Sequence, residues 1–204
     1  MASLFSKTIH GIGWGGLSVT VNILFQLVFM AVLARLLDPA HFGLIAIANV
    51  VLRFLTYFAQ LGVGPALIQK PELADGDVRA ALSVSLSIST VCMVIAMIAA
   101  PFITNYFVMP LLEPVVRALS VNFLLGGLSA VSLSLLRREM RFKQIAIIES
   151  SAYIVGYGLI GITLAYLGFG VWALVGAVLS QSTLTAGLAF LFSRHEFGWR
   201  HQKN

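Results

Sequence analysis

Apolar runs of membrane-spanning length recur along the sequence, and they constrain the fold more than any other feature. Two of them meet at the corner Ala31–Leu44, where Pro39 biases the preceding Asp38 away from helical dihedrals and so ends the first segment. Pro39 can open the next helix at its first position, because its missing N–H costs nothing there. Arg35 lies three residues before Asp38, close enough to pair with it at a helix end. This corner is typical of a hairpin in a membrane.

The composition favours lipid over water as the main solvent. Of the 204 residues, 59% are hydrophobic and 10% are charged, and the mean hydropathy is +0.94. A soluble domain of this length carries roughly 25% charged residues, because its surface needs them. A helix needs about 20 apolar residues to cross ~30 Å of hydrocarbon, and the runs reach that length. The sequence therefore predicts an all-α integral membrane protein.

The apolar runs and the polar loops between them predict six transmembrane helices packed as a bundle. The predicted helices lie at about residues 12–36, 42–61, 80–107, 117–136, 144–167 and 171–192, and a basic cytoplasmic tail covers residues 193–204.

Two patterns of small residues fall inside the predicted helices. The alternation Ser83–Ser89 mimics a strand, but the run continues apolar, and serines in membrane helices bond back to their own backbone. We therefore predict a helix there. Asn122, Gly126, Ala130 and Ser134 recur every four residues, and such a stripe lets helix backbones approach closely in lipid.

Lys and Arg residues are distributed unevenly between the two sides of these segments. Ten lie on the side of the N-terminus, two lie on the other side and Arg53 lies within the membrane, which accounts for all 13. Because loops rich in Lys and Arg stay in the cytoplasm, this bias predicts that both termini are cytoplasmic. The same loops explain the net charge of +5 without a nucleic-acid partner.

No constellation for catalysis is present in the sequence. It has no G-x-x-x-x-G-K-[ST] loop, no H-E-x-x-H and no G-x-S-x-G motif. Cys92 is the single cysteine and sits inside an apolar segment, so the chain has no disulfide framework and no thiolate metal site. The four histidines lie at segment ends or in tails. We therefore expect no enzyme activity, no catalytic residue, no metal and no cofactor.

Polar side chains inside the bilayer are the candidate functional site. Arg53 lies near the middle of the second segment, where a lipid-facing guanidinium would cost about 2.5–3.5 kcal/mol on insertion scales. This cost predicts that Arg53 faces a wet cavity or a partner, and Tyr57 extends its face one turn later. Asn22 and Gln26 share one face of the first segment, which should look into the protein. These four are candidate substrate-binding residues.

Glu149 lies inside the fifth segment and completes the candidate site. In a functional interpretation, Arg53 holds an anionic substrate while Glu149 pairs with Arg53 or carries a proton. In a structural interpretation, the two residues form a bracing ion pair, or Glu149 extends to the nearby cytoplasmic interface. The sequence leaves both interpretations open.

Four motifs follow one another in the order found in a known family. They span residues 33–44, 61–69, 136–143 and 167–175, with the sequences LARLLDPAHFGL, LGVGPALIQ, LRREMRFK and LGFGVWALV. Together they resemble bacterial polysaccharide flippases, the oligosaccharide or O-antigen translocase group of the multidrug/oligosaccharidyl-lipid/polysaccharide exporter superfamily. The resemblance covers about Phe5 to Phe190.

The resemblance implies two similar helical lobes around a central cationic cavity, of which this chain offers the first. It implies movement of a lipid-pyrophosphate-linked oligosaccharide from the cytoplasmic to the periplasmic leaflet of the bacterial inner membrane, during lipopolysaccharide, capsule or exopolysaccharide biosynthesis. The implied partners are that lipid-linked oligosaccharide, membrane lipids, a second lobe or copy, and the polysaccharide polymerisation machinery. Arg53 suits the substrate, because guanidinium pairs well with phosphate oxygens.

Two other functions compete with this interpretation. A cation-coupled multidrug exporter of the same superfamily would share the fold but usually has an acidic residue in the first segment, which here has no carboxylate before Asp38. A non-transporting membrane scaffold in envelope polymer assembly would use Arg53 to brace helices. The length of the chain fits a fragment, a truncated gene product or a half-unit that pairs.

Overall fold

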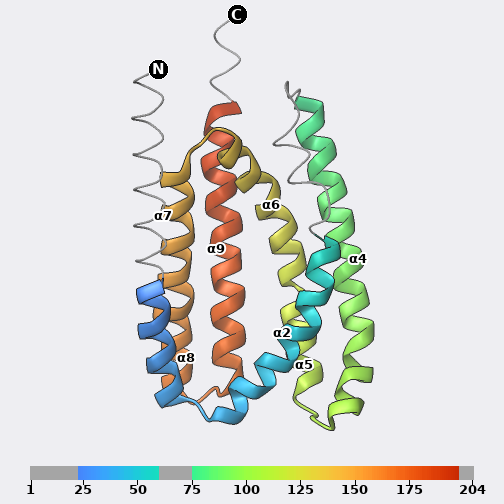
Figure 1. The fold of residues 1–204 in the computed structure, drawn as a ribbon, viewed down its shortest axis with the longest axis vertical. Coiled ribbons are helices and arrows are strands. Elements are labelled where there is room, and N and C mark those ends of the chain that lie inside the picture. The colour runs from blue at the N-terminus through green and yellow to red at the C-terminus, as the bar shows by residue number, and fades with distance from the viewer. Residues whose placement is uncertain (1–22, 60–74, 198–204) are drawn as a thin grey trace, which may run out of the picture.

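The computed structural model describes residues 23–59 and 75–197, and these residues form helices without strands (Figure 1). The helices are Ile23–Leu36, α2 (Pro39–Ala59), α4 (Asp75–Phe107), α5 (Leu112–Ser120), α6 (Asn122–Arg138), α7 (Phe142–Tyr153), the π-helix η1 (Ile154–Gly161), α8 (Ile162–Tyr166) and α9 (Val171–Phe197). The predicted all-α fold is confirmed.

Five runs in the described part of the chain are long and apolar enough to cross a membrane. They are Pro39–Tyr57, Gly76–Phe107, Leu112–Arg138, Phe142–Tyr166 and Val171–Ser193. The helix Ile23–Leu36 is apolar but shorter over the described residues, and the rest of the first predicted segment lies outside them. The chain is therefore a multi-pass membrane protein. The division into a six-helix lobe and a basic tail stays a prediction.

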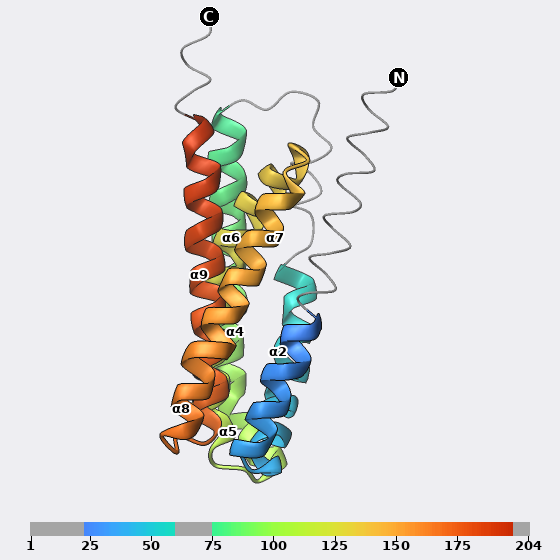
Figure 2. The same ribbon diagram turned by 90° about the vertical axis from the view of Figure 1, so that its left-hand side faces the viewer.

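The helices form an elongated bundle, and Figure 2 shows α9 along one side of it. Helix α9 packs against α6 on one side and against α7 and η1 on the other, while α2 crosses α4 and α5 (Figures 1 and 2). The helix Ile23–Leu36 joins this arrangement through Leu33 and Leu37, which are buried against residues of α8 and α9. The α6–α7 turn lies at one end of the bundle, and the α4–α5 and α8–α9 turns lie at the other (Figure 1).

The corner between the first helix and α2 contains a helix cap, but not the ion pair expected between Arg35 and Asp38. Asp38 precedes Pro39, and its Oδ1 accepts a hydrogen bond from the backbone N–H of Ala40 at 2.8 Å. Asp38 thus satisfies an N–H that the start of α2 would leave without a partner. Both Arg35 and Asp38 are described and exposed, but no ion pair joins them. The carboxylate is used for the cap instead.

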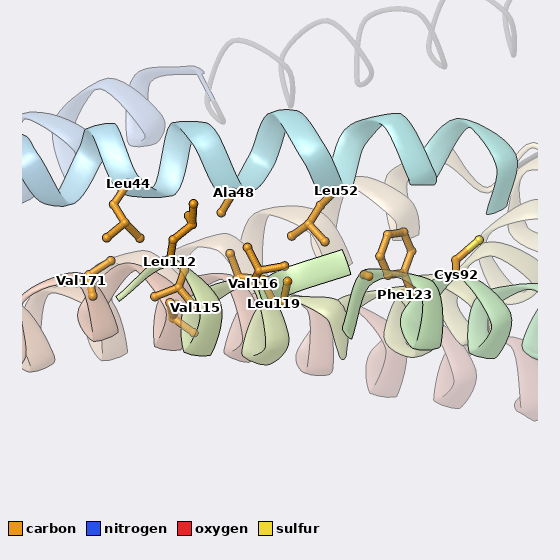
Figure 3. Close-up of a cluster of buried hydrophobic side chains, with 13 residues drawn as sticks. Leu44, Ala48, Leu52, Cys92, Leu112, Val115, Val116, Leu119, Phe123 and Val171 are labelled. Carbon is orange, nitrogen blue, oxygen red and sulfur yellow. The ribbon is translucent and has the colours of Figure 1, made fainter. Parts of the chain in front are cut away.

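The main apolar core lies where α2 crosses α5 and the start of α9. Leu44, Ala48 and Leu52 recur every four residues along α2 and point toward the leucine and valine side chains of α5 (Figure 3). This spacing places them on one face of the helix. The core fixes α2 against α5 on one side, and its far end reaches Cys92 and Phe123.

Glycines allow η1 and α9 to pack closely against each other. A Cβ on Gly156 would lie 2.8 Å from the backbone oxygen of Ala177, and one on Gly161 would lie 3.0 Å from Ala177 Cβ. On the opposite side of η1, a Cβ on Gly158 would lie 2.7 Å from the ring of Phe29. Small residues let membrane helices approach to packing distance, so η1 is held tightly between its two neighbours.

Candidate functional site

A cavity of about 270 Å³ lies between α2, α4 and α6, with α5 and α9 contributing apolar walls. Its polar lining consists of six residues: Asn49, Arg53, Thr56, Ser85, Ser89 and Asn122. At ~1.5 Å rise per residue, Arg53 lies roughly 21 Å along α2 from Pro39, within the membrane-length run Pro39–Tyr57. The cavity gives Arg53 polar neighbours, whereas its environment in the membrane stays a prediction.

Arg53 stands at the edge of this cavity. It is exposed, although it lines the cavity, and the structure gives it no ion pair or hydrogen bond with the residues that it describes. An α-helix turns by about 100° per residue, so Asn49 and Thr56 lie about 40° and 60° to the cavity side of Arg53. Tyr57 lies about 40° to the opposite side by the same count, and it is 76% exposed. The guanidinium is therefore available to an anion that enters the cavity.

Asn122 provides a second unsatisfied polar group in the wall. Its side-chain oxygen Oδ1 is buried and has no hydrogen-bond partner among the described residues. A buried acceptor without a donor costs about 1–3 kcal/mol, so it favours a ligand or water that brings an N–H or O–H. Asn122 begins α6 on the face that carries Gly126 and Ala130, which also line the cavity.

The close packing of α4 against α6 closes the floor of the cavity. Ser85 Oγ donates a hydrogen bond to the backbone oxygen of Gly127 at 3.0 Å, and both Ser85 and Ser89 are buried. A Cβ on Gly127 would lie 2.3 Å from Ser89 Oγ. Ser83 bonds back to Ala80 on its own helix, as predicted for these serines, but Ser85 reaches across to α6.

The predicted stripe of small residues on α6 has a different role from the one expected. A Cβ on Gly126 would have nothing within 4 Å, so Gly126 opens the cavity and does not bring helices together. Gly127, one residue later, makes the close approach to α4. The prediction was wrong for Gly126, because two adjacent residues on a helix differ by about 100° in direction, and only the tertiary packing decides which one meets the neighbour.

The structure brings one of the five predicted site residues to the cavity. Arg53 lines it, whereas Gln26 and Tyr57 are exposed elsewhere and Glu149 is half-buried on α7. Asn22 lies outside the described residues.

No ion pair joins Arg53 and Glu149, which are both described. The positive charge whose field reaches Glu149 is that of Arg137, at the end of α6. Glu149 lies one turn before Tyr153, which belongs to a column of stacked rings formed by Phe25, Phe29, Tyr153 and Tyr157, with successive centroids 5.7, 6.1 and 4.7 Å apart. This column docks the first helix on α7 and η1, away from the cavity.

Sequence reasoning missed five polar residues of the site, namely Asn49, Thr56, Ser85, Ser89 and Asn122. Asn49 had a usable signal, because it lies one turn before Arg53 and two polar residues at that spacing share a helix face. The serines gave no comparable signal, since their alternation is compatible with bonding to their own helix.

Comparison with known proteins places the chain in a family. A family model described as "Polysaccharide biosynthesis protein" matches residues 32–204, which is most of the chain. The chain belongs to this family. No solved structure gives a significant match to it.

Three relatives of this family member cover nearly all of the chain. It is 25% identical to the "Lipopolysaccharide biosynthesis protein WzxC" of Escherichia coli strain K12, over 90% of the chain and 37% of that protein. It is 28% identical to the "Succinoglycan biosynthesis transport protein ExoT" of Rhizobium meliloti strain 1021, over 93% of the chain and 38% of that protein. An "Uncharacterized membrane protein in cps region" of Klebsiella pneumoniae is 26% identical over 98% of the chain and 42% of its own length. The chain thus spans about two fifths of the length of these curated relatives.

Proposed function

We propose that this chain takes part in moving a lipid-pyrophosphate-linked oligosaccharide from the cytoplasmic to the periplasmic leaflet of the bacterial inner membrane. The step serves lipopolysaccharide, capsule or exopolysaccharide biosynthesis. Membership of the polysaccharide biosynthesis family and the names of two relatives support a saccharide cargo. The chain acts as part of a larger or paired unit, because it spans about two fifths of the length of those relatives.

The observation that carries the proposal is the position of Arg53 on a polar cavity between α2, α4 and α6. A pyrophosphate is the part of such a substrate that lipid excludes most strongly, and a guanidinium binds phosphate oxygens with two parallel hydrogen bonds. The neutral amides and hydroxyls beside Arg53 suit sugar hydroxyls, which both donate and accept hydrogen bonds. Asn22, Gln26, Tyr57 and Glu149 stay predicted substrate-binding residues.

The distribution of cations between the two ends of the bundle supports one orientation in the membrane. Among the described cations, Arg79, Arg137, Arg138, Arg141 and Lys143 lie on or beside the end that carries the α6–α7 turn, whereas Arg35 and Arg117 lie at the other end. Loops rich in Lys and Arg face the cytoplasm. This supports cytoplasmic termini and a cavity that takes its substrate from that side.

The two competing functions make different demands on the cavity. A cation-coupled exporter usually has an acidic residue in the first segment, where this sequence has none before Asp38, and the polar lining of the cavity holds one arginine with neutral amides and hydroxyls. A scaffold that uses Arg53 as a brace needs a partner for the guanidinium, and none lies among the described residues. Both observations favour the transport of an anion.

The test is leaflet exchange of a fluorescent lipid-pyrophosphate-linked saccharide in vesicles that hold several copies of the chain each. Hydrogen bonds to charged groups are worth about 1.5–3 kcal/mol, so Arg53→Ala should slow exchange roughly 10- to 100-fold. Arg53→Lys keeps the charge without the bidentate geometry. Its exchange rate should lie between the rates of Arg53→Ala and of the unmodified chain. Exchange by Arg53→Ala at the rate of the unmodified chain would overturn the proposal.

Arg35→Ala is the matched control for this experiment. Arg35 is an exposed arginine near the end of the first helix, it has no ion pair with Asp38, and it does not line the cavity. It should leave the exchange rate unchanged. Dilution to one chain per vesicle should abolish exchange if the chain acts as a paired unit. A separate experiment with a fluorescent drug cation tests the multidrug exporter and should give no Arg53-dependent transport.

A further inference from the structure

The turn between α6 and α7 ends in a strained and exposed methionine. The backbone N–H of Arg141 bonds to the oxygen of Leu136 at 3.0 Å, and the N–H of Met140 bonds to the oxygen of Arg137 at 3.0 Å. These two bonds define a Schellman motif, whose left-handed position is usually occupied by glycine. Here Met140 holds that position, with a φ of 56°.

The turn between α8 and α9 shows what glycine does in the same motif. The N–H of Phe169 bonds to the oxygen of Leu164, the N–H of Gly168 bonds to the oxygen of Ala165, and Gly168 has a φ of 81°. In this region the Cβ of a side chain lies too close to the following carbonyl oxygen, a strain that glycine does not incur. Met140 is 69% exposed, so packing within the described chain does not offset that strain.

The α4–α5 turn contains a second left-handed residue with an exposed side chain and can be compared with Met140. Val108 is also left-handed, with a φ of 55°, and it is 82% exposed. The segment Phe107–Leu112 around it is apolar, so a lipid environment alone accounts for its exposed side chains. Met140 differs because it stands among cations.

Four cations and one acidic residue lie within the seven residues of the α6–α7 turn: Arg137, Arg138, Glu139, Arg141 and Lys143, with Met140 and Phe142 between them. A side-chain oxygen of Glu139 lies 3.6 Å from a guanidinium nitrogen of Arg141, and four cations with one carboxylate give the turn an excess of positive charge. Phe142 is 41% exposed next to Met140. Because α6 and α7 both belong to membrane-length runs, this turn lies at the membrane surface.

We propose that the α6–α7 turn is a binding site for anionic phospholipid. Met140 and Phe142 insert into the boundary between headgroups and acyl chains, and Arg137 and Lys143 contact the headgroup phosphates. Insertion of exposed apolar area offsets the strain at Met140, and the cations select anionic over zwitterionic headgroups, because each cation near such a surface strengthens binding. This site is separate from the cavity and does not depend on the proposed substrate.

The test measures binding of fluorescent phosphatidylglycerol and phosphatidylcholine to the full chain in neutral detergent micelles. Phosphatidylglycerol should bind more tightly, and the preference should weaken at high salt. The double change Arg137→Gln with Lys143→Gln should reduce its affinity roughly 30-fold. The double change Arg35→Gln with Arg117→Gln removes the same charge from the other end of the bundle and should leave the affinity unchanged.

Met140→Gly distinguishes a lipid site from a structural turn. Glycine relieves the left-handed strain, so the variant should melt at a higher temperature in detergent while it binds phosphatidylglycerol more weakly. Any of three results would overturn the proposal. They are equal binding of the two phospholipids, an equal loss of phosphatidylglycerol affinity in the control double variant, and unweakened phosphatidylglycerol binding by Met140→Gly. Displacement of the phospholipid by inorganic phosphate would also overturn it, because it would show a site for free anions.

Discussion

The contact of η1 with α9 and the contact of α4 with α6 both contain buried glycines, but different groups lie opposite them. A Cβ added at Gly156 would meet the backbone oxygen of Ala177 at 2.8 Å and the backbone nitrogen of Gln181 at 2.9 Å. At Gly127 the nearest atom is the hydroxyl of Ser89, and Gly126 beside it faces open space. The η1–α9 contact has no room for an added Cβ. The α4–α6 contact has a side chain that can move and a cavity next to it.

This difference separates a rigid part of the bundle from a part that can accept a ligand. The π-helix η1 is fixed between α9 and the ring of Phe29, so the aromatic column and α9 behave as one unit. Helices α4 and α6 meet through a serine hydroxyl and a glycine, with Arg53 across the cavity on α2. Substitutions in the two regions should therefore have different consequences.

The largest effect should come from Gly156→Ala. Its methyl group would overlap backbone atoms of α9, and overpacking of this kind costs about 1–3 kcal/mol even where side chains can adjust. We expect little folded chain to remain after mild heating in detergent, measured by size-exclusion chromatography. Gly187→Ala on α9, where nothing lies within 4 Å, is the control and should keep the stability of the unmodified chain.

Gly127→Ala should have a smaller effect that a second change can correct. The added methyl meets Ser89, whose side chain can be removed, and then the backbone oxygen of Ser85 at 3.3 Å. We expect a clear drop in melting temperature, and partial recovery in the double variant with Ser89→Gly. No recovery in the double variant would show that the α4–α6 contact is as rigid as the η1–α9 contact.

Ser85→Ala should cost less again. It removes the hydrogen bond of 3.0 Å from Ser85 Oγ to the backbone oxygen of Gly127. Hydrogen bonds between membrane helices average about 0.6 kcal/mol, so the melting temperature should fall by only a few degrees. A loss as large as that of Gly156→Ala would contradict the distinction between the two contacts.

Gly126→Leu should have the smallest effect on stability and a large effect on function. Its side chain would extend into the cavity without meeting a neighbour, since nothing lies within 4 Å of the Cβ position. Folded yield and melting temperature should stay close to those of the unmodified chain, while leaflet exchange of the lipid-linked saccharide is lost. Normal exchange in this variant would show that the substrate does not use the cavity.

The features predicted from sequence are those that local physics decides. The apolar runs, the corner at Asp38 and Pro39, and the placement of Arg53 where lipid is costly all depend on short stretches of chain. The ion pair expected between Arg35 and Asp38 is absent, and the Asp38 carboxylate caps the start of α2. The remainder of the site depends on which neighbour a residue meets, as the opposite environments of Gly126 and Gly127 demonstrate.

Glu149 illustrates the same limit of prediction from sequence. Its distance in sequence from Arg53 says nothing of its distance in space, and the helix that carries it faces the aromatic column instead of α2. A sequence pattern identifies a costly buried charge, but only the packing of α7 against η1 and α9 determines which charges it can meet.

The most direct test of the central claim is substrate protection of a thiol placed inside the cavity. Gly126→Cys would be made together with Cys92→Ala, which removes the native buried thiol, and its modification by a small maleimide would be timed. A lipid-pyrophosphate-linked saccharide should slow the reaction about tenfold, and Arg53→Ala should remove this protection. A reaction rate that the lipid-linked saccharide leaves unchanged, in a chain that retains Arg53, would contradict the account.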